Sequence, residues 1–378
     1  MVQNLKRPKV LTIVGTRPEL IKLSQVMKLL DQTVEHVFIH TGQNYDFELN
    51  EIFYRDLKIR KPDHFLNAVK NTAMATTAEI LIKVDELLES LKPDAVLLYG
   101  DTNSTLCGIA VKRKRIPLFH MEAGNRSFDK RVPEELNRKI IDHISDINFT
   151  NSEVARQHLI LEGLPIRSII MAGSPMREVL QEHQTQIKNS QVLEKLSLKK
   201  QNFFVVSLHR EENVDSPEKL KTFLGFLESV SELHRKEIVF SVHPRTEKRL
   251  QDLGLKPTDR KFTSLKPLGF CDYVHLQSQA LCTISDSGTI TEESSILGFR
   301  ALTPRAAHER PEGTDQGVLI KSPMEESSLM NALQTTLKLP PPSLVPDYAI
   351  PDTSIRVVKA ILSQIDQIQR NNWFLNSL

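Results

Sequence analysis

The chain has 378 residues, of which 40% are apolar and 25% are charged, and its formal net charge is +2. These values are typical of a soluble globular protein, and the length predicts two domains rather than one. The small net charge gives no reason to expect nucleic acid as a partner, and no apolar run approaches the length needed to span a membrane.

The N-terminal segment and the cysteines predict a cytoplasmic protein. Residues 1–8 carry charge, but no apolar stretch follows them, so we expect no signal peptide. The three cysteines, Cys107, Cys271 and Cys282, include no C-x-x-C pair. Such a sparse, odd set favours a reducing compartment over a disulfide framework.

Short β-rich runs alternate along the chain with longer helical patterns, which predicts an α/β fold with parallel sheets. In the first half we expect strands at 9–14, 35–40, 95–99, 117–121, 147–151 and 168–172. In the second half we expect them at 203–208, 238–242, 262–264, 281–285, 300–303 and 317–320. Apolar residues recur at helical spacing in 79–91. The two halves predict two Rossmann-like domains facing each other across a cleft.

The polar, weakly periodic stretch 174–202 separates the two predicted domains. We expect an N-terminal domain of residues 1–175 and a C-terminal domain of residues 176–352. The segment 353–378 begins with capping residues and has a regular apolar face, so it predicts a terminal helix. A proline-rich connector precedes this helix and would let it return to the N-terminal domain.

Polar residues directly follow five of the predicted strands. These segments begin at Gly15, Gly100, Glu122, His209 and Asp286. In an open parallel sheet, ligands bind just beyond the carboxyl ends of the strands. The five segments therefore predict one cleft that is assembled from distant parts of the chain.

In the second domain, the small residues at 285–289 lead into a predicted helix start. Free backbone N–H groups at such a turn can bind a phosphate, with Ser287 adding a hydroxyl and Gly288 allowing close approach. Glu293, one turn further, can accept hydrogen bonds from ribose hydroxyls. The alternative is an ordinary helix capped by Asp286 or Ser287.

Two neighbouring strand ends of this domain pair a histidine with an arginine, which would suit a diphosphate. They are His209 with Arg210 and His243 with Arg245. A metal site that uses His209, His243 and His275 is the alternative, but no metal-ligand spacing supports it, so we predict no metal.

In the first domain, Gly15 and Pro18 predict a turn into a helix, from which Arg17 would project, with Lys22 one to two turns later. A solvated basic helix start is the alternative interpretation. No G-x-G-x-x-G motif follows the first strand, which argues against a dinucleotide cofactor, and we predict no cofactor of any kind.

Carboxylates provide the sharper signal in this domain. Asp101 and Glu122 each follow a predicted strand directly, and Glu134 and Glu135 stand at a predicted helix start. Acids in a first helical turn are often only partners of the helix dipole. Several carboxylates that face phosphate-binding groups would instead suit proton transfer near an anionic leaving group.

Taken together, these segments resemble the non-hydrolysing UDP-N-acetylglucosamine 2-epimerase family over roughly residues 9–335. The motifs that carry the resemblance are the segments 15–19, 40–43, 100–102, 120–124, 133–138, 209–213, 285–293 and 309–312. The family implies a two-domain, GT-B-like fold, as in many glycosyltransferases, and a homodimer, with neither nicotinamide nor metal. It also implies that UDP is eliminated to give a 2-acetamidoglycal and is then added back after reprotonation of C2.

The resemblance assigns roles to residues at matching positions. Asp101, Glu122 and Glu134 match the family's catalytic acids, and His209 matches the group that contacts the leaving diphosphate. The other matching positions, which bind UDP or hold the catalytic groups, are Arg17, Lys22, Arg138, Ser287, Gly288 and Glu293.

A narrower resemblance, to the UDP-N-acetyl-L-fucosamine synthase subgroup, rests on the segments 122–135, 142–148 and 173–176. It implies UDP-2-acetamido-2,6-dideoxy-L-talose as the substrate, in capsule or O-antigen synthesis. The segment 300–307 departs from the family pattern. The alternatives are a UDP-N-acetylglucosamine 2-epimerase, a glycosyltransferase of the same architecture and a non-catalytic UDP-sugar binding protein.

Overall fold

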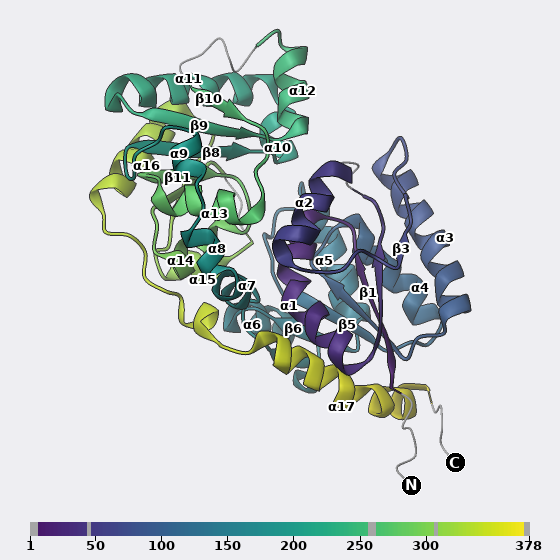
Figure 1. The fold of residues 1–378 in the computed structure, drawn as a ribbon. Helices are drawn as coiled ribbons and strands as arrows, with labels where there is room; N and C mark the ends of the chain where they lie inside the picture. The colour runs from purple at the N-terminus through teal and green to yellow at the C-terminus, as the bar shows by residue number, and fades with distance from the viewer. Residues whose placement is uncertain (1–6, 44–46, 256–261, 306–308, 374–378) are drawn as a thin grey trace. The chain divides into compact units, whose positions relative to one another are not determined.

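The computed structural model of the protein describes residues 7–43, 47–255, 262–305 and 309–373. The chain forms two compact units (Figure 1). The first ends at Gln181 and resumes at Asp347, and the second is Glu182–Pro346. These divisions fall a few residues from the predicted ones, and the α/β class is confirmed.

A seven-stranded parallel sheet, ordered β3-β2-β1-β4-β5-β6-β7, forms the centre of the first unit. Its strands are β1 Lys9–Val14, β2 Glu35–His40, β3 His64–Phe65, β4 Ala95–Tyr99, β5 Leu118–Ala123, β6 Ile147–Thr150 and β7 Ile169–Met171. All six strands predicted for this half are present. The sequence analysis missed β3, because a strand of two residues is too short to show an alternating pattern.

Helices cover both faces of this sheet (Figure 1). They are α1 Arg17–Thr33, α2 Phe47–Leu57, α3 Ala73–Leu91, α4 Gly108–Arg113, α5 Pro133–Ile144, α6 Glu153–Leu161, α7 Met176–Glu182 and α17 Thr353–Trp373. Apolar side chains of α1 and α17 pack with Leu97 and Phe119 on one face. Those of α3, α4 and α5 pack with Val96 and Leu118 on the other. The predicted terminal helix thus belongs to the first unit as α17, while residues 374–378 lie outside the described part.

The second unit has a six-stranded parallel sheet in the order β10-β9-β8-β11-β12-β13. Its strands are β8 Phe203–Leu208, β9 Glu237–Val242, β10 Thr263–Leu265, β11 Cys282–Ser285, β12 Ala301–Thr303 and β13 Ile320–Lys321. All six correspond to predicted strands, although β13 begins later than expected. The polar stretch predicted as a linker contains α7 and two more short helices, α8 Gln184–Lys188 and α9 Val192–Lys195.

Helices also cover both faces of the second sheet. The remaining ones are α10 Glu211–Val214, α11 Pro217–His234, α12 Pro244–Asp252, α13 Phe270–Gln279, α14 Ile290–Leu297, α15 Pro311–Asp315 and α16 Glu326–Lys338. Apolar residues of α11 and α16 pack with Val206 and Ile284. Those of α9 and α13 pack with Val205 on the opposite face.

Each sheet reverses its strand order at one place, between β1 and β4 in the first unit and between β8 and β11 in the second. Such a reversal opens a crevice at the carboxyl ends of the strands, where ligands of open α/β sheets bind. Gly15 and Gly100 follow the first pair of strands, and His209 and Asp286 follow the second pair. The fold therefore places four of the five polar segments at these two points.

Candidate active site

At the reversal point of the first sheet, the Glu19 side chain forms hydrogen bonds with both loops that follow β1 and β4. Its carboxylate accepts hydrogen bonds from the N–H groups of Gly15 (2.5 Å) and Thr16 (3.2 Å) and from the Thr102 hydroxyl (2.6 Å). Burial raises the pKa of Glu19 to about 7, against these hydrogen bonds, which lower it. The sequence analysis did not single out Glu19, although Thr16-x-x-Glu19 has the spacing of a capping box and forms one.

Asp101, which follows β4, lies against a buried arginine from α5. Arg138 Nε donates to Asp101 Oδ2 at 2.6 Å, and its NH1 group donates to Glu135 Oε2 at 2.9 Å. Burial tends to raise the pKa of Glu135, but the Ser127 N–H and the Arg138 guanidinium outweigh it and hold the pKa below its usual value. Arg138 therefore links Asp101 to a structural carboxylate on α5.

Glu122 belongs to β5, and the expectation that the strand ends at 121 was wrong. Its backbone has a left-handed φ of +64°, and the pairing of β5 with β6 shifts register between Met121 and Ala123. Such a bulge re-aims a side chain that strict alternation would send elsewhere. The Glu122 carboxylate accepts from Lys22 Nζ at 2.7 Å and from the Tyr99 hydroxyl at 2.5 Å.

A buried histidine connects the two strands that carry these acids. His120 Nε2 lies 2.7 Å from the carbonyl oxygen of Gly100, and its Nδ1 lies 2.9 Å from Asp142 Oδ1. Asp142 also accepts from the Gly124 N–H at 3.1 Å and from Arg126 at 2.7 Å. This network fixes the backbone just before Asp101 and just after Glu122, and only the tertiary pairing of β4 with β5 reveals it.

Glu134 stands in the first turn of its helix, as expected, whereas Arg17, which we expected in the preceding loop, begins its helix. Glu134 follows Pro133 at the start of α5 and is half-buried, and Arg17 is the first residue of α1. The Arg17 guanidinium lies 5.7 Å from the centre of the Phe53 ring. The structure thus brings the predicted residues of the first domain to the carboxyl end of one sheet or to the helix starts that follow its strands.

In the second unit, Asp286 organises the loop that follows β8. It is fully buried and accepts from the N–H groups of His209 and Arg210 and from the Asn213 side chain, and its Oδ1 lies 3.0 Å from His209 Nδ1. Burial tends to raise the pKa of Asp286, but the charge and hydrogen bonds of His209, with the other donors, lower it to about 2. Asp286 therefore acts as a fixed anion that orients His209.

The alternative interpretation, in which Asp286 or Ser287 caps the following helix, does not describe the structure. Helix α14 begins at Ile290, Thr289 holds the N-cap position, and no side chain caps that position by a hydrogen bond. The reason is that Asp286 is occupied by the loop after β8, while the Ser287 hydroxyl lies 3.0 Å from that of Thr289.

Gly288 lies next to the charged side chains of Glu309 and Arg310. A Cβ at Gly288 would lie 2.7 Å from Glu309 Oε1, and Arg310 Nε donates to the Gly288 carbonyl at 3.0 Å. Glu309 in turn meets Arg210 at 3.2 Å and Arg305 at 3.0 Å. A side chain at this position would therefore have to displace the Glu309 carboxylate.

Other expected ligand groups of this unit have protein partners. Glu293 is buried and accepts from Gln277 Nε2 at 3.1 Å. His243 is the N-cap of α12, and its ring centre lies 5.9 Å from that of His209. Arg245 pairs with Glu211 and Asp215, each at 2.5 Å, so those carboxylates neutralise the guanidinium that we expected to face a diphosphate.

The described residues hold neither a cluster suited to a metal ion nor a helix that could span a membrane. No group of three or more His, Cys, Asp or Glu side chains is arranged there to hold a metal ion. No helix among those residues is long and apolar enough to cross a membrane.

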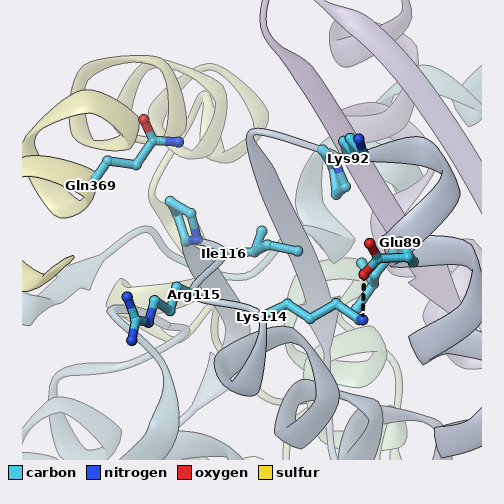
Figure 2. Close-up of a pocket in the computed structure, with 9 residues that line it drawn as sticks. Glu89, Lys92, Lys114, Arg115, Ile116 and Gln369 are labelled. Atoms are coloured by element: carbon cyan, nitrogen blue, oxygen red, sulfur yellow. Dashed lines mark hydrogen bonds and ion pairs between the residues drawn. The ribbon is translucent and has the colours of Figure 1, made fainter. Parts of the chain in front are cut away.

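A cavity of about 410 Å³ lies at the other end of the first sheet (Figure 2). Its lining is Leu88, Glu89, Lys92, Pro93, Lys114, Arg115, Ile116, Pro117 and Gln369. Pro93 and Pro117 precede β4 and β5, so the cavity lies at the amino ends of the strands whose carboxyl ends carry Asp101 and Glu122. None of the predicted site residues lines it.

Two parallel α/β sheets, each with polar groups beyond its reversal point, define a GT-B-like protein. A solved UDP-N-acetylglucosamine 2-epimerase from Rickettsia bellii matches with a TM-score of 0.91 and 48% identity, over 98% of this chain and all of that one. The Methanocaldococcus jannaschii enzyme in complex with UDP-GlcNAc and UDP matches with a TM-score of 0.89 and 32% identity, over 94% and 99% of the two chains. A UDP-2,3-diacetamido-2,3-dideoxy-D-glucuronate 2-epimerase from Pseudomonas aeruginosa is 32% identical over 87% of this chain and 92% of its own.

The family model described as UDP-N-acetylglucosamine 2-epimerase matches residues 28–362. The chain belongs to this family, and it is an enzyme of the non-hydrolysing UDP-sugar 2-epimerase class.

Proposed function

We propose that this enzyme inverts C2 of a UDP-N-acetylhexosamine by eliminating UDP and adding it back. The observation that carries the proposal is the placement of Asp101 and Glu122 at the carboxyl ends of the neighbouring strands β4 and β5, each against a buried cation. Carboxylates held in this way keep a defined orientation while they exchange a proton with a substrate.

In the first step a carboxylate removes the proton from C2. The electron pair of that bond forms a C1–C2 double bond, the C1–O bond breaks, and UDP leaves with its electron pair. Because a C2–H is a weak acid, the charge that develops on the diphosphate must be stabilised in the same transition state. The product of this step is a 2-acetamidoglycal.

In the second step a protonated carboxyl group delivers a proton to the opposite face of C2. A diphosphate oxygen then bonds to C1, which restores the UDP-sugar with C2 inverted. We assign the two proton transfers to two of the three acids Asp101, Glu122 and Glu134, one on each face of C2.

For the diphosphate we propose His209 together with Ser287 and Gly288. Asp286 engages Nδ1 of His209, so Nε2 is the ring nitrogen available to a ligand, and the side chain is 34% exposed. The backbone at Ser287 and Gly288 precedes α14, whose N-terminus favours an anion. Arg17, Lys22, Arg138 and His243 complete the proposed set that binds UDP or holds the catalytic groups, with Glu293 at the ribose.

For the sugar we propose UDP-2-acetamido-2,6-dideoxy-L-talose, which would give UDP-N-acetyl-L-fucosamine for capsule or O-antigen synthesis. The segments 122–135, 142–148 and 173–176 support this choice through their resemblance to the L-fucosamine synthase subgroup. The second candidate is UDP-N-acetylglucosamine, because the Rickettsia and Methanocaldococcus proteins are named for that substrate.

Proton NMR in deuterated water, with the two sugars in parallel tubes, tests the proposal. Deuterium at C2 with formation of the fuco sugar in the first tube would support both reaction and substrate. Exchange in the UDP-N-acetylglucosamine tube alone would support the proposed reaction, but it would make UDP-N-acetylglucosamine the substrate in place of the talose sugar. No exchange in either tube would count against epimerisation and favour a glycosyltransferase, identified by UDP release that depends on an acceptor, or a UDP-sugar binding protein.

We also propose that the enzyme works as a homodimer in the cytoplasm. The family resemblance supports the first of these, and the three cysteines outside any disulfide support the second. Analytical ultracentrifugation that gives the mass of a single chain would contradict the dimer, and recovery of the protein outside the cytosolic fraction would contradict the compartment.

A further inference from the structure

Building on the proposed function, we propose that Tyr99 is a positioning residue for the acid–base reaction, and that its hydroxyl acts by orienting Glu122. Tyr99 Oη donates to Glu122 Oε2 at 2.5 Å, and Lys22 Nζ donates to the same oxygen at 2.7 Å. Two donors that bind the same oxygen hold the Glu122 carboxylate in one plane. They thereby also fix the direction in which its other oxygen, Oε1, points. Tyr99 was not among the residues predicted for the site.

The position of Tyr99 follows from strand pairing. It is the last residue of β4 and lies opposite Met121 in the parallel register with β5. Tyr99 and Met121 both belong to the apolar cluster under α1, the helix that carries Lys22. In a regular strand the next residue, Glu122, would point to the opposite face. The bulge instead brings its carboxylate to Tyr99 and Lys22.

This arrangement must hold a backbone conformation that is unfavourable by itself. Glu122 has a φ of +64°, a region that residues with a Cβ rarely adopt. The three side chains are nearly removed from solvent: Lys22 is 2%, Tyr99 3% and Glu122 13% exposed. The Lys22 ammonium also lies 5.6 Å from the centre of the Tyr99 ring. Tyr99 therefore contacts both members of the Lys22–Glu122 ion pair.

The alternative interpretation is that Tyr99 is a purely structural residue of the core, and that its hydrogen bond to Glu122 has no effect on the reaction. Tyr54 provides the matched control for that interpretation. It belongs to the same apolar cluster and is 7% exposed, and its hydroxyl has no hydrogen-bond partner among the described residues. Tyr→Phe removes one buried hydroxyl at either position, but only at Tyr99 does it remove a donor to a proposed catalytic carboxylate.

The first experiment compares C2 deuterium exchange by the wild type, Tyr99→Phe and Tyr54→Phe. We expect Tyr99→Phe to lower the maximal exchange rate by about 10- to 100-fold, since small errors in placing a reacting group cost this much, with the UDP dissociation constant unchanged. Tyr54→Phe should exchange like the wild type. If Tyr99→Phe also exchanges at the wild-type rate, the positioning role is overturned while the proposed function stands. A wild type that does not exchange overturns the proposed function and the positioning role with it.

The second experiment does not depend on activity. A double-mutant cycle measures the urea midpoint shift of Tyr99→Phe in the wild type and in a Glu122→Ala background, which lacks the acceptor. We expect the shift to differ between the two backgrounds, because the Tyr99 hydroxyl donates to the Glu122 side chain that alanine removes, and the shift of Tyr54→Phe to be the same in both. Equal Tyr99→Phe shifts in both backgrounds would overturn the contact itself, whatever the exchange rates.

Discussion

Both units place carboxylates at or beyond the carboxyl ends of their strands, but the surroundings of these carboxylates differ. In the first unit, Asp101 is 21% and Glu122 13% exposed, and each faces a cationic side chain. In the second unit, Asp286 is fully buried and accepts from two backbone N–H groups and an amide, while Glu309 is 6% exposed between two arginines.

This difference separates the acids that we propose to be reactive from the structural ones. A carboxylate that accepts several fixed donors is stabilised in its charged form and resists protonation. One that keeps an exposed edge can exchange a proton with a ligand. The first unit is therefore the proposed source of acid–base chemistry, and the second the proposed source of anion binding.

The largest effect that would test this comparison is expected at the two partly buried acids of the first unit, Glu122 and Asp101. We expect Glu122→Gln and Asp101→Asn each to lower C2 deuterium exchange by about 10²- to 10⁴-fold, because an amide keeps the shape of the side chain but cannot exchange the proton. NMR exchange measures the loss, and calorimetric titration with UDP should show that binding is retained.

Wild-type exchange in both variants would contradict the assignment of the first unit. A loss of UDP binding that equals the loss of exchange would instead show that these carboxylates act on affinity.

Asp286→Asn should act on the second unit through stability. The pKa of Asp286 is lowered to about 2 from 3.8, so the unfolded state binds the proton more readily. Its ionised form stabilises the fold by about 2 kcal/mol above pH 4, and this contribution is lost as the pH falls toward 2. Urea unfolding at pH 7 and pH 3 should show the gap between wild type and variant narrowing at the lower pH.

A gap of the same size at both pH values would show that the Asp286 charge is not what stabilises the loop. UDP titration of the same variant should show weaker binding, because His209 loses the acceptor that orients it.

The larger part of the fold could be predicted, because the apolar pattern of a strand and the polar residues that end it can both be seen in a short stretch of sequence. The strands that begin at Lys9, Ala95 and Phe203 have the bounds given by their apolar runs. The helix start at Pro133 could be predicted in the same way. The single carboxylates Asp101 and Asp286 could be placed at strand ends, because each directly follows a buried run.

The partners of these residues could not be predicted, because they come from other strands and helices. The bulge at Glu122 leaves no mark on the local pattern, and it decides that Tyr99 and Lys22 are its partners. The same limit applies to Asp286, which forms its hydrogen bonds across the sheet rather than capping α14. Long-range pairing, rather than residue type, separates the reactive from the structural acids.

Gly288→Ala tests the glycine turn of the second unit with a smaller expected effect. The new Cβ would lie 2.7 Å from Glu309 Oε1, so the carboxylate between Arg210 and Arg305 must move. We expect UDP affinity to fall about tenfold, or about 1.4 kcal/mol, in calorimetric titration.

Gly225→Ala is the matched control. Gly225 lies inside α11, and a Cβ there would be 3.5 Å from Glu326 Oε2, which is an ordinary van der Waals distance. Alanine there should add about 0.5–1 kcal/mol of stability without changing UDP affinity. Wild-type affinity in the Gly288→Ala protein would mean that Glu309 moves freely and that the turn does not require glycine.

The smallest effect is expected for Lys114→Ala. Comparison with Lys22→Ala then tests the two ends of the first sheet against each other. Lys114 lines the cavity at the amino ends of β4 and β5 and pairs with Glu89 at 2.9 Å (Figure 2). It also pairs with Asp85 at 3.2 Å. Because solvent and salt screen such partly exposed pairs, we expect Lys114→Ala to leave C2 exchange and UDP affinity unchanged. Lys22→Ala, measured beside it, should lose exchange because it strips Glu122 of its buried cation. Equal losses in both variants would show that the carboxyl end of the sheet has no special role, and the contrast between reactive and structural acids would then need another cause.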